Sequence, residues 1–302
     1  MTTIGVVGLG AMGGRIAGRL LAQGHVVHGT NRTRSKADAL VAQGLVWCEN
    51  PRTTAQDSDV VLSMVTNDAA LEAVTQGPDG IVAGLAPGTV YVDMSTVSPT
   101  ASRTLAERVA TRRASMLSAP VSGSVPAAEE GNLAIIVGGQ VDTFERVEPI
   151  LRQLGSTVTF VGDVGHALLL KLAINISLAV QMLAFSEGVL LAEQGWLDRT
   201  VALQVMTHSA IGSPMLQARA ALIRDLPDNA WFDVAMMQKD LGLALDTGRE
   251  HGLPMPSTTV ADRMLSSARA AGYAHRDIAV LFRLLADMVA APRSRTLGSA
   301  TA

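Results

Sequence analysis

The first 163 residues alternate short apolar runs with longer segments in which apolar positions recur every three or four residues. The runs predict β-strands and the periodic segments predict helices. The expected strands are residues 3–7, 25–30, 60–65, 89–93, 116–119, 133–137 and 158–161, and the expected helices are 15–23, 36–43, 68–76, 98–110 and 142–154. This alternation favours an α/β fold, with a doubly wound, mainly parallel sheet and helices on both faces. Ligands of such sheets bind beyond the carboxyl ends of the strands.

The pattern changes after residue 163, because no later run resembles a strand. Segments with helical periodicity follow one another, separated by glycines and prolines. They are residues 165–193, 199–207, 214–223, 234–250, 257–271 and 277–290. We therefore predict a sheet domain over residues 1–163, an all-helical domain over 164–291, and a flexible tail over 292–302.

The segment 165–193 is apolar on nearly every side, which is typical of a buried helix. Polar residues interrupt it every few positions, so a bilayer centre would penalise it and we expect the core helix of a soluble protein. Two of them, Lys171 and Asn175, are four residues apart and share one helix face. A buried ammonium needs partners. Lys171 therefore either snorkels to solvent or pairs with a carboxylate, or it has a chemical role.

Composition narrows the possible partners. Hydrophobic residues make up 48% of the 302 residues and charged residues 17%, as in a folded protein with room for two cores. A net charge of −3 and 3% aromatic residues argue against nucleic acid. The six histidines are scattered without clustered carboxylates, so we expect no metal. Cys48 is the single cysteine, and no signal peptide is recognisable, so we expect a cytoplasmic protein with no membrane segment.

A glycine-rich turn follows the first strand directly. It reads Gly8-Leu9-Gly10-Ala11-Met12-Gly13 and leads into a helix. The first glycine permits the tight turn, the second lets a pyrophosphate approach the backbone, and the third lets helix and strand pack closely. The amides at the helix N-terminus then face the phosphates. Because the motif lies within a βαβ unit, it predicts a Rossmann-type domain that binds a dinucleotide.

The end of the second strand bears on the choice of cofactor. An NAD site carries an acidic residue about 20 residues after the glycines, where it binds the ribose hydroxyls. This chain has Asn31-Arg32-Thr33 there instead. A guanidinium can clamp a 2′-phosphate, which a carboxylate would repel. We predict a preference for NADP(H), with NAD(H) possible. The alternative is a solvated turn in which Ser35 caps a helix.

Three further segments at strand ends carry candidate binding groups. Val65-Thr66-Asn67 follows one strand, and Ser95-Thr96 follows the next. The hydroxyls of the second segment could also cap the helix that begins at Ser98. Farther on, the small residues of 119–124 leave backbone amides exposed, which suits a substrate carboxylate. The alternative for 119–124 is a plain turn, and no helical pattern begins immediately after it.

These pieces together resemble the β-hydroxyacid dehydrogenase family, over about residues 3–290. The resemblance rests on five motifs in order: Gly8–Gly13, Ser95-Thr96, Ala119-Pro-Val-Ser-Gly123, Gly165-x5-Lys171-x3-Asn175, and the segment 232–241. It implies a Rossmann-type NADP-binding domain, a helical substrate and oligomerisation domain, and a homodimer or homotetramer.

The resemblance also implies roles for individual residues. Lys171 matches the catalytic lysine, and Asn175 matches a residue that places the lysine or the substrate. The loop with Ser122, Gly123 and Ser124 matches the segment that holds the substrate carboxylate. Further matches are cofactor contacts, at Val65, Thr66, Thr96 and Lys239. Lys239 and Asp240 could instead be an exposed charge pair.

The substrate loop departs from the family pattern at two positions. Ser118 stands where an acidic residue is usual, and Ser124 replaces a second glycine. The segment 123–131 looks most similar to glyoxylate/succinic semialdehyde reductases. We therefore predict an NADP-dependent oxidoreductase of the 3-hydroxyisobutyrate dehydrogenase type, which transfers hydride between nicotinamide and a small β-hydroxy acid or semialdehyde acid. The alternatives are an imine reductase on the same architecture and a catalytically silent dinucleotide-binding scaffold.

Overall fold

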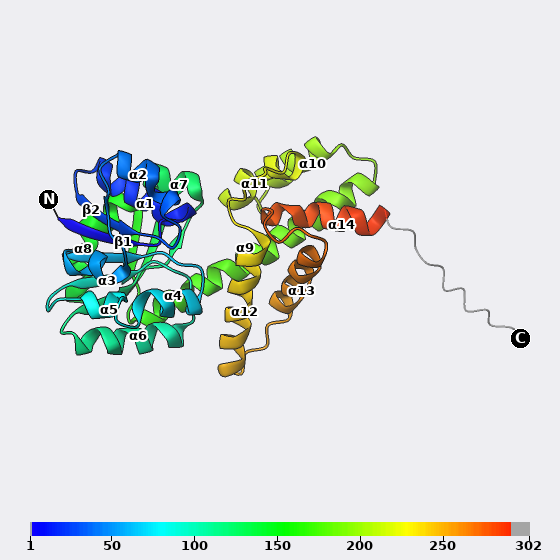
Figure 1. Ribbon diagram of the computed structural model, residues 1–302. Helices are drawn as coiled ribbons and strands as arrows, with labels where there is room; N and C mark the ends of the chain where they lie inside the picture. The colour runs from blue at the N-terminus through cyan, green and yellow to red at the C-terminus, as the bar shows by residue number, and fades with distance from the viewer. Residues whose placement is uncertain (1, 291–302) are drawn as a thin grey trace, which may run out of the picture. The chain divides into compact units, whose positions relative to one another are not determined.

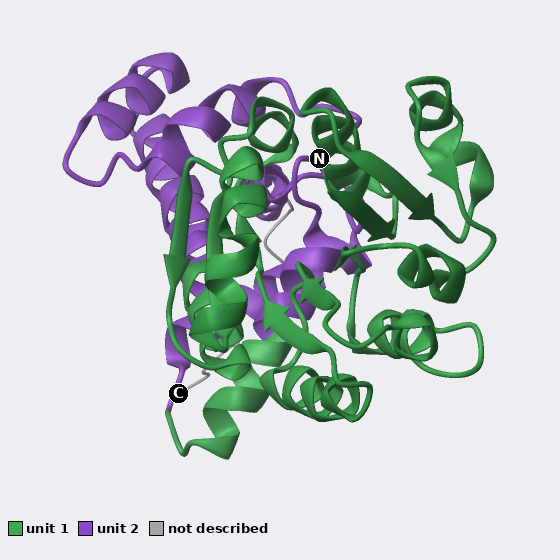
Figure 2. Cartoon of the chain, turned by 90° about the vertical axis from the view of Figure 1, so that its left-hand side faces the viewer, with its two compact units in different colours: residues 1–175, 242–253 green, residues 176–241, 254–302 purple. Residues whose placement is uncertain are grey.

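The computed structural model describes residues 2–290, and the predicted tail lies outside them. Contacts divide the chain into two compact units (Figure 2). The first contains residues 1–175 together with 242–253, and the second contains 176–241 and the chain from 254 onward. The first unit thus extends beyond residue 163, because the start of the long helix packs into its core: Leu168 shares a hydrophobic cluster with Val7 and Tyr91.

The first unit is built on a mainly parallel sheet (Figure 1). Its strands are β1 (Thr3–Val7), β2 (Val26–Thr30), β3 (Val46–Trp47), β4 (Val60–Ser63), β5 (Val90–Asp93), β6 (Ser115–Ser118), β7 (Val121–Ser122), β8 (Ala134–Gly139) and β9 (Thr157–Phe160). The order is β3-β2-β1-β4-β5-β6-β8-β7, with β9 paired to β8. The neighbours from β3 to β6 are parallel, whereas β8 runs antiparallel to β6 and β7.

Side chains alternate between the two faces of this sheet. Ile4 and Val6 belong to one hydrophobic cluster and Val7 to another, and Val90 and Tyr91 divide in the same way. Helices supply many of the other side chains of both clusters. They are α1 (Ala11–Ala22), η1 (Arg34–Ala37), α2 (Asp38–Ala42), α3 (Pro51–Gln56), α4 (Asp68–Thr75), α5 (Ile81–Gly84), α6 (Pro99–Thr111), α7 (Val125–Glu130) and α8 (Val141–Leu154). The predicted doubly wound α/β fold is confirmed.

The second unit consists of helices around its own hydrophobic core. The long helix α9 (Val164–Gln194) leads into it, followed by α10 (Arg199–His208), α11 (Pro214–Arg224), α12 (Val234–Glu250), α13 (Pro256–Ala270), η2 (Ile278–Val280) and α14 (Leu281–Ala290). Between residues 164 and 290 the only β-type pairing is an isolated bridge from Asp233 to Asp277. By length and composition α9 could cross a membrane, a test that core helices of soluble proteins also pass.

A buried carboxylate joins the segments of the second unit. Asp277 is fully buried and accepts hydrogen bonds from the backbone amides of Trp231, Phe232 and Ala279. The Arg219 guanidinium on α11, itself 7% exposed, lies 3.4 Å from Asp277 Oδ1. These contacts tie α11, the segment before α12 and η2 to one another, so they hold the helical core in a single arrangement.

The sequence pattern did not predict several short elements. β3 and β7 have two residues each, which is too short for a strand period to be visible. The helix α3 begins with a capping box at Asn50 and Thr53. The expectation that no helix begins after Ser124 was wrong: α7 starts at Val125, with a proline in its first turn. Proline is favoured there because the first helical amides lack intrahelical partners.

Candidate cofactor and substrate site

The three glycines of the turn between β1 and α1 have different surroundings. Gly8 has φ +96°, and a Cβ built on it would overlap the Met64 carbonyl oxygen. A Cβ on Gly13 would overlap the Gly8 carbonyl oxygen. A Cβ on Gly10 would meet no atom within 4 Å. Packing therefore requires glycine at positions 8 and 13, whereas position 10 is open to a ligand.

The N-terminus of α1 is arranged to receive an anion. Gly10 is its N-cap and offers no side chain, so no side-chain cap bonds to the first amides of the helix. The turn is fixed from the other side, because Asn31 at the end of β2 accepts a 3.1 Å hydrogen bond from the Leu9 amide. The Asn31 side-chain amide donates to the Thr33 carbonyl oxygen at 2.9 Å. Asn31 thus connects the glycine turn to the segment that follows β2.

The two arginines after β2 differ in their surroundings. Arg34 lies 3.4 Å from a Glu49 carboxylate oxygen and stacks over the Trp47 ring, 5.3 Å from its centroid. Arg32 is exposed and makes no hydrogen bond or ion pair with the described residues. The guanidinium of Arg32 is therefore the one available to a phosphate beyond this strand end.

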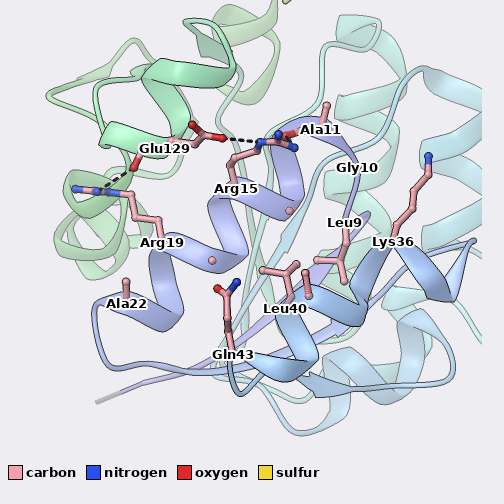
Figure 3. Close-up of a pocket in the computed structure, with 13 residues that line it drawn as sticks. Leu9, Gly10, Ala11, Arg15, Arg19, Ala22, Lys36, Leu40, Gln43 and Glu129 are labelled. Atoms are coloured by element: carbon pink, nitrogen blue, oxygen red, sulfur yellow. Dashed lines mark hydrogen bonds and ion pairs between the residues drawn. The ribbon is translucent and has the colours of Figure 1, made fainter. Parts of the chain in front are cut away.

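An open groove of about 630 Å³ runs between α1 and α2 (Figure 3). Gly14 and Gly18 of α1 and Leu40 of α2 line it. The turn residues Leu9 and Gly10 and the side chain of Lys36 lie toward one end of the groove, away from Ala22 and Gln43. Lys36 therefore adds a further cation at this end of the groove, which the motifs alone did not single out.

The ends of β4 and β5 are connected by side chains. The Val65 amide donates to Ser95 Oγ at 2.9 Å, so the segment after β4 is tied to the segment after β5. Val65 is half-buried and Thr66 is exposed, and Thr96 is half-buried. Asn67 and Ser98 cap α4 and α6. The capping alternative therefore holds for Ser98 and not for Ser95.

A polar cluster lies beneath these two segments, and the sequence motifs did not reveal it. Asp93 Oδ1 accepts hydrogen bonds from Ser63 Oγ at 2.7 Å and from the Ser95 amide at 3.2 Å. The Tyr91 hydroxyl lies 2.7 Å from Ser63 Oγ. Burial raises the pKa of Asp93 above its ordinary value, and burial also raises the pKa of Tyr91. The available signal was a polar residue at the last position of two neighbouring strands, Ser63 and Asp93.

The predicted substrate loop leaves the sheet through β7. Ser122 is its last strand residue, and Gly123 has φ +145°, a conformation that L side chains rarely adopt. Ser122 and Ser124 are half-buried, whereas Gly123 is exposed. Ser118 is fully buried, and its hydroxyl lies 2.6 Å from Ser102 Oγ on α6. Of the two positions that depart from the family pattern, Ser118 therefore contacts a helix of the fold, whereas Ser124 belongs to the predicted substrate loop.

The lysine and asparagine of α9 are in contact. Lys171 Nζ donates to Asn175 Oδ1 at 3.0 Å, and the two side chains lie on one face as their spacing predicts. Lys171 is 8% exposed and Asn175 is 1% exposed, so Lys171 does not snorkel into solvent. One turn earlier, Leu168 shares a hydrophobic cluster with Val65 and Val97, which adjoin the cofactor segments.

Lys239 lies in the second unit, on α12. Its ammonium is 2.5 Å from Asp240 Oδ1, and Asp240 is 2% exposed. The Lys239 side chain is about one-fifth exposed, so the pair is more buried than a solvated surface pair. Across residues 2–290 no three His, Cys, Asp or Glu side chains are grouped to hold a metal ion.

Comparisons with known proteins agree with this geometry. Residues 3–162 match the family described as the NAD binding domain of 6-phosphogluconate dehydrogenase. Residues 165–285 match the family described as NAD-binding of NADP-dependent 3-hydroxyisobutyrate dehydrogenase.

Individual relatives cover nearly the whole chain. The 2-(hydroxymethyl)glutarate dehydrogenase of Eubacterium barkeri is 33% identical, over 94% of this chain and 95% of its own. The chloroplastic glyoxylate/succinic semialdehyde reductase 2 of Arabidopsis thaliana is 30% identical, over 94% and 79%. The solved 3-hydroxyisobutyrate dehydrogenase of Mycobacterium tuberculosis, with L-serine, is 29% identical with a TM-score of 0.83, over 94% and 99%.

Imine reductases of known structure are more distant. They are 17–23% identical, with TM-scores of 0.63–0.64, so they share the fold alone. The matches to both halves and along the whole chain extend to the glycine turn and to the segment with Lys171 and Asn175. The chain belongs to the β-hydroxyacid dehydrogenase family of NAD(P)-dependent oxidoreductases.

Proposed function

We propose that this protein uses NADP(H) to interconvert a small β-hydroxy acid and the corresponding semialdehyde acid. The observation that carries the proposal is the buried hydrogen bond from Lys171 Nζ to Asn175 Oδ1, in the unit that also carries the glycine turn. Burying an ammonium is unfavourable unless it is paired or hydrogen-bonded, and Asn175 Oδ1 provides such a partner for Lys171. Hydride transfer to an aldehyde requires a proton donor near the carbonyl oxygen, in a site from which water is largely excluded.

The residues of the first unit fit a dinucleotide. The open approach to Gly10 and the uncapped start of α1 suit a pyrophosphate. Val65, Thr66 and Thr96, beyond β4 and β5, would hold the nicotinamide half, as ligands of parallel sheets bind beyond the strand ends. When bound, the cofactor would supply or accept the hydride. Lys239 remains a proposed cofactor contact, as the family resemblance implies.

The preference for NADP(H) follows from the segment after β2. Arg32 can form charge-assisted hydrogen bonds to a 2′-phosphate, and Lys36 adds a second positive charge. Arg32 lies in the turn that is closed by the hydrogen bond from the Asn31 side chain to the Thr33 carbonyl oxygen. The family described for residues 165–285 is NADP-dependent, which supports the same choice. NAD(H) would bind without the contribution of these cations.

The chain's own groups then account for the proton and the charge. During reduction of an aldehyde the carbonyl oxygen becomes negative, and the Lys171 ammonium can stabilise that oxygen and donate a proton to it. In the oxidative direction the neutral amine takes the hydroxyl proton. Asn175 holds the lysine nitrogen through its Oδ1. Ser122 and Gly123 would bind the substrate carboxylate, which fixes the other end of the molecule.

The relatives narrow the substrate class. Their names include a glyoxylate/succinic semialdehyde reductase and dehydrogenases of 2-(hydroxymethyl)glutarate and 3-hydroxyisobutyrate. Each of these compounds joins a carboxylate to an aldehyde or alcohol through a short carbon skeleton. The buried position of Ser118 leaves Ser122, Gly123 and Ser124 as the loop residues through which this chain would select among such acids.

A substrate screen with Lys171→Ala tests the proposal. We expect wild-type protein to oxidise NADPH with glyoxylate, succinic semialdehyde or methylmalonate semialdehyde. Lys171→Ala should lower kcat by about 100-fold or more, the scale of a lost acid–base group, while NADPH still binds. Turnover at the wild-type rate in the variant would remove Lys171 from the mechanism. NADPH binding without oxidation by any short aldehyde acid would favour the silent scaffold, and turnover of cyclic imines alone would favour an imine reductase.

We further propose a homodimer or homotetramer formed through the helical unit. Large apolar side chains are exposed there from the end of α9 through the connection into α10, at Leu191, Trp196, Leu197, Val201 and Val205. Exposed large apolar side chains in one stretch of the chain favour a protein–protein interface. Sedimentation velocity would test the assembly, and fractionation would test the proposed cytoplasmic location.

A further inference from the structure

Asp93 occupies the centre of three neighbouring strand ends. It is the last residue of β5 and is paired in register with Ser63 at the end of β4 and with Ser118 at the end of β6. All three side chains are fully buried. The segments that follow these strands are the two predicted cofactor segments and the predicted substrate loop. A change at Asp93 would therefore affect the place where all three begin.

A chain of hydrogen bonds runs from this carboxyl group to the cofactor segments. Asp93 Oδ1 accepts from Ser63 Oγ and from the Ser95 amide, and Ser95 Oγ accepts from the Val65 amide. The hydroxyl of Tyr91 supports Ser63 from the same strand as Asp93. The main chain adds a link toward the substrate loop, because the Ala119 amide donates to the Asp93 carbonyl oxygen at 2.7 Å.

Stability alone does not account for this carboxyl group. It lies beside an apolar cluster that includes Tyr91, Val61 and Leu105. Its Oδ2 is buried and makes no hydrogen bond with the described residues. A buried polar atom without a partner is unfavourable, and well-packed apolar residues often replace buried charged groups with a gain in stability. What an apolar residue cannot provide is the acceptor that holds the Ser95 amide and, through Ser95, the Val65 amide.

We propose that Asp93 is a positioning residue for cofactor binding: through Ser63 and Ser95 it holds the segments after β4 and β5 at a fixed spacing. The inference rests on the proposed function, because Val65, Thr66 and Thr96 are assigned there to the cofactor. Asp93 itself, being fully buried, acts through its neighbours and not by touching the cofactor.

Three variants and a matched control test this role. Ser95→Ala removes the acceptor for the Val65 amide. Asp93→Leu removes the carboxyl group, and Asp93→Asn keeps a polar acceptor of the same shape. Ser102→Ala is the control, because it removes another fully buried hydroxyl, one that bonds to Ser118 and not to a cofactor segment. The readouts are the Kd for NADPH from nicotinamide fluorescence and the Tm without cofactor.

We expect Ser95→Ala to raise the Kd for NADPH about five- to tenfold, the range of one lost hydrogen bond in a binding equilibrium. Asp93→Leu should raise it at least as much, and Asp93→Asn should stay within about twofold of wild type. Ser102→Ala should lower the Tm without changing the Kd. Because Asp93→Leu can fail to fold, Ser95→Ala carries the test by itself.

Two results would overturn the inference. One is a wild-type Kd in Ser95→Ala, and the other is a Kd in Ser102→Ala that rises as much as in Ser95→Ala, since general loosening would then explain both. A wild-type protein that binds neither NADPH nor NADP⁺ would instead refute the proposed function. The two failures are distinguishable because the first requires a cofactor-binding wild type.

Discussion

Gly10→Ala separates the binding role of the glycine turn from its packing role. Gly10 has φ −78° and ψ −158°, which an alanine can adopt, and its Cβ would meet no atom within 4 Å. Alanine also reduces the entropy of the unfolded chain, by an amount worth about 0.4–1 kcal/mol, while alanine is a poorer N-cap than glycine. These effects oppose each other, so we expect the free energy of unfolding to change by less than about 1 kcal/mol.

The same methyl group would stand where a pyrophosphate approaches α1. Displacing the phosphates from the helix amides would weaken about two charge-assisted hydrogen bonds, each worth about 1.5–3 kcal/mol. We expect a loss of at least about 3 kcal/mol, which corresponds to more than a 100-fold rise in the Kd for NADPH. Titration of nicotinamide fluorescence measures the Kd, and thermal unfolding without cofactor measures stability.

Gly13→Ala is the matched comparison. Its Cβ would overlap the Gly8 carbonyl oxygen and lie 3.2 Å from Met64 Cβ, so the backbone must move. Overpacking of this kind destabilises by about 1–3 kcal/mol, and the Tm should fall together with the affinity. The reasoning is refuted if Gly10→Ala binds NADPH with wild-type affinity, or if it lowers the Tm as much as Gly13→Ala does.

Three further predictions concern other sites. Arg32→Ala should raise the KM for NADPH more than tenfold and leave the KM for NADH unchanged. Arg34→Ala is the control: it removes a side chain that contacts Glu49 and Trp47, and it should change the KM for either cofactor little. Equal effects of Arg32→Ala on NADPH and NADH would exclude a contact with the 2′-phosphate. Asp277→Ala should lower the free energy of unfolding by about 3–5 kcal/mol, because it leaves Arg219 buried without its carboxylate partner. Asp246→Ala, which removes an exposed ion pair, should change the free energy of unfolding by less than about 1 kcal/mol. Denaturant unfolding measures both. Burial, with a smaller contribution from Asp68, raises the pKa of Asp93, so the folded state holds this proton more tightly than the unfolded state. The contribution of Asp93 to stability is therefore fully present below its unfolded pKa and is lost as pH rises through its folded pKa. The Tm of Asp93→Asn relative to wild type should increase as pH rises from below the ordinary aspartate pKa of 3.8, and a constant difference would contradict the burial of a titrating carboxyl group.

The elements that the sequence predicted well are those with a long or distinctive pattern. The β1 strand matches its expected bounds, and α9 extends only one residue beyond its expected bounds at each end. The prediction that Lys171 and Asn175 share one face of α9 is confirmed, because their side chains form a hydrogen bond. Periodicity and spacing act locally along the chain, so they specify such features without knowledge of the tertiary contacts.

The features that the sequence did not predict depend on contacts between distant segments. The hydroxyl of Ser118 contacts Ser102 on α6, so the residue at position 118 that differs from the family pattern takes part in packing within the fold. The chain of bonds from Asp93 to Val65 crosses two strands, and no local pattern specifies it. The short helix α7 was missed because Ser124 and Pro126 were interpreted as loop residues.

The hydrogen bonds of Asn31 have a consequence for engineering the cofactor preference. An acidic residue at this position is the usual route to NAD, but the Asn31 side-chain nitrogen donates to the Thr33 carbonyl oxygen. A carboxylate there would place two acceptors about 3 Å apart and open the turn that also holds the Leu9 amide. Redesign toward NAD should therefore begin at Arg32 and retain Asn31.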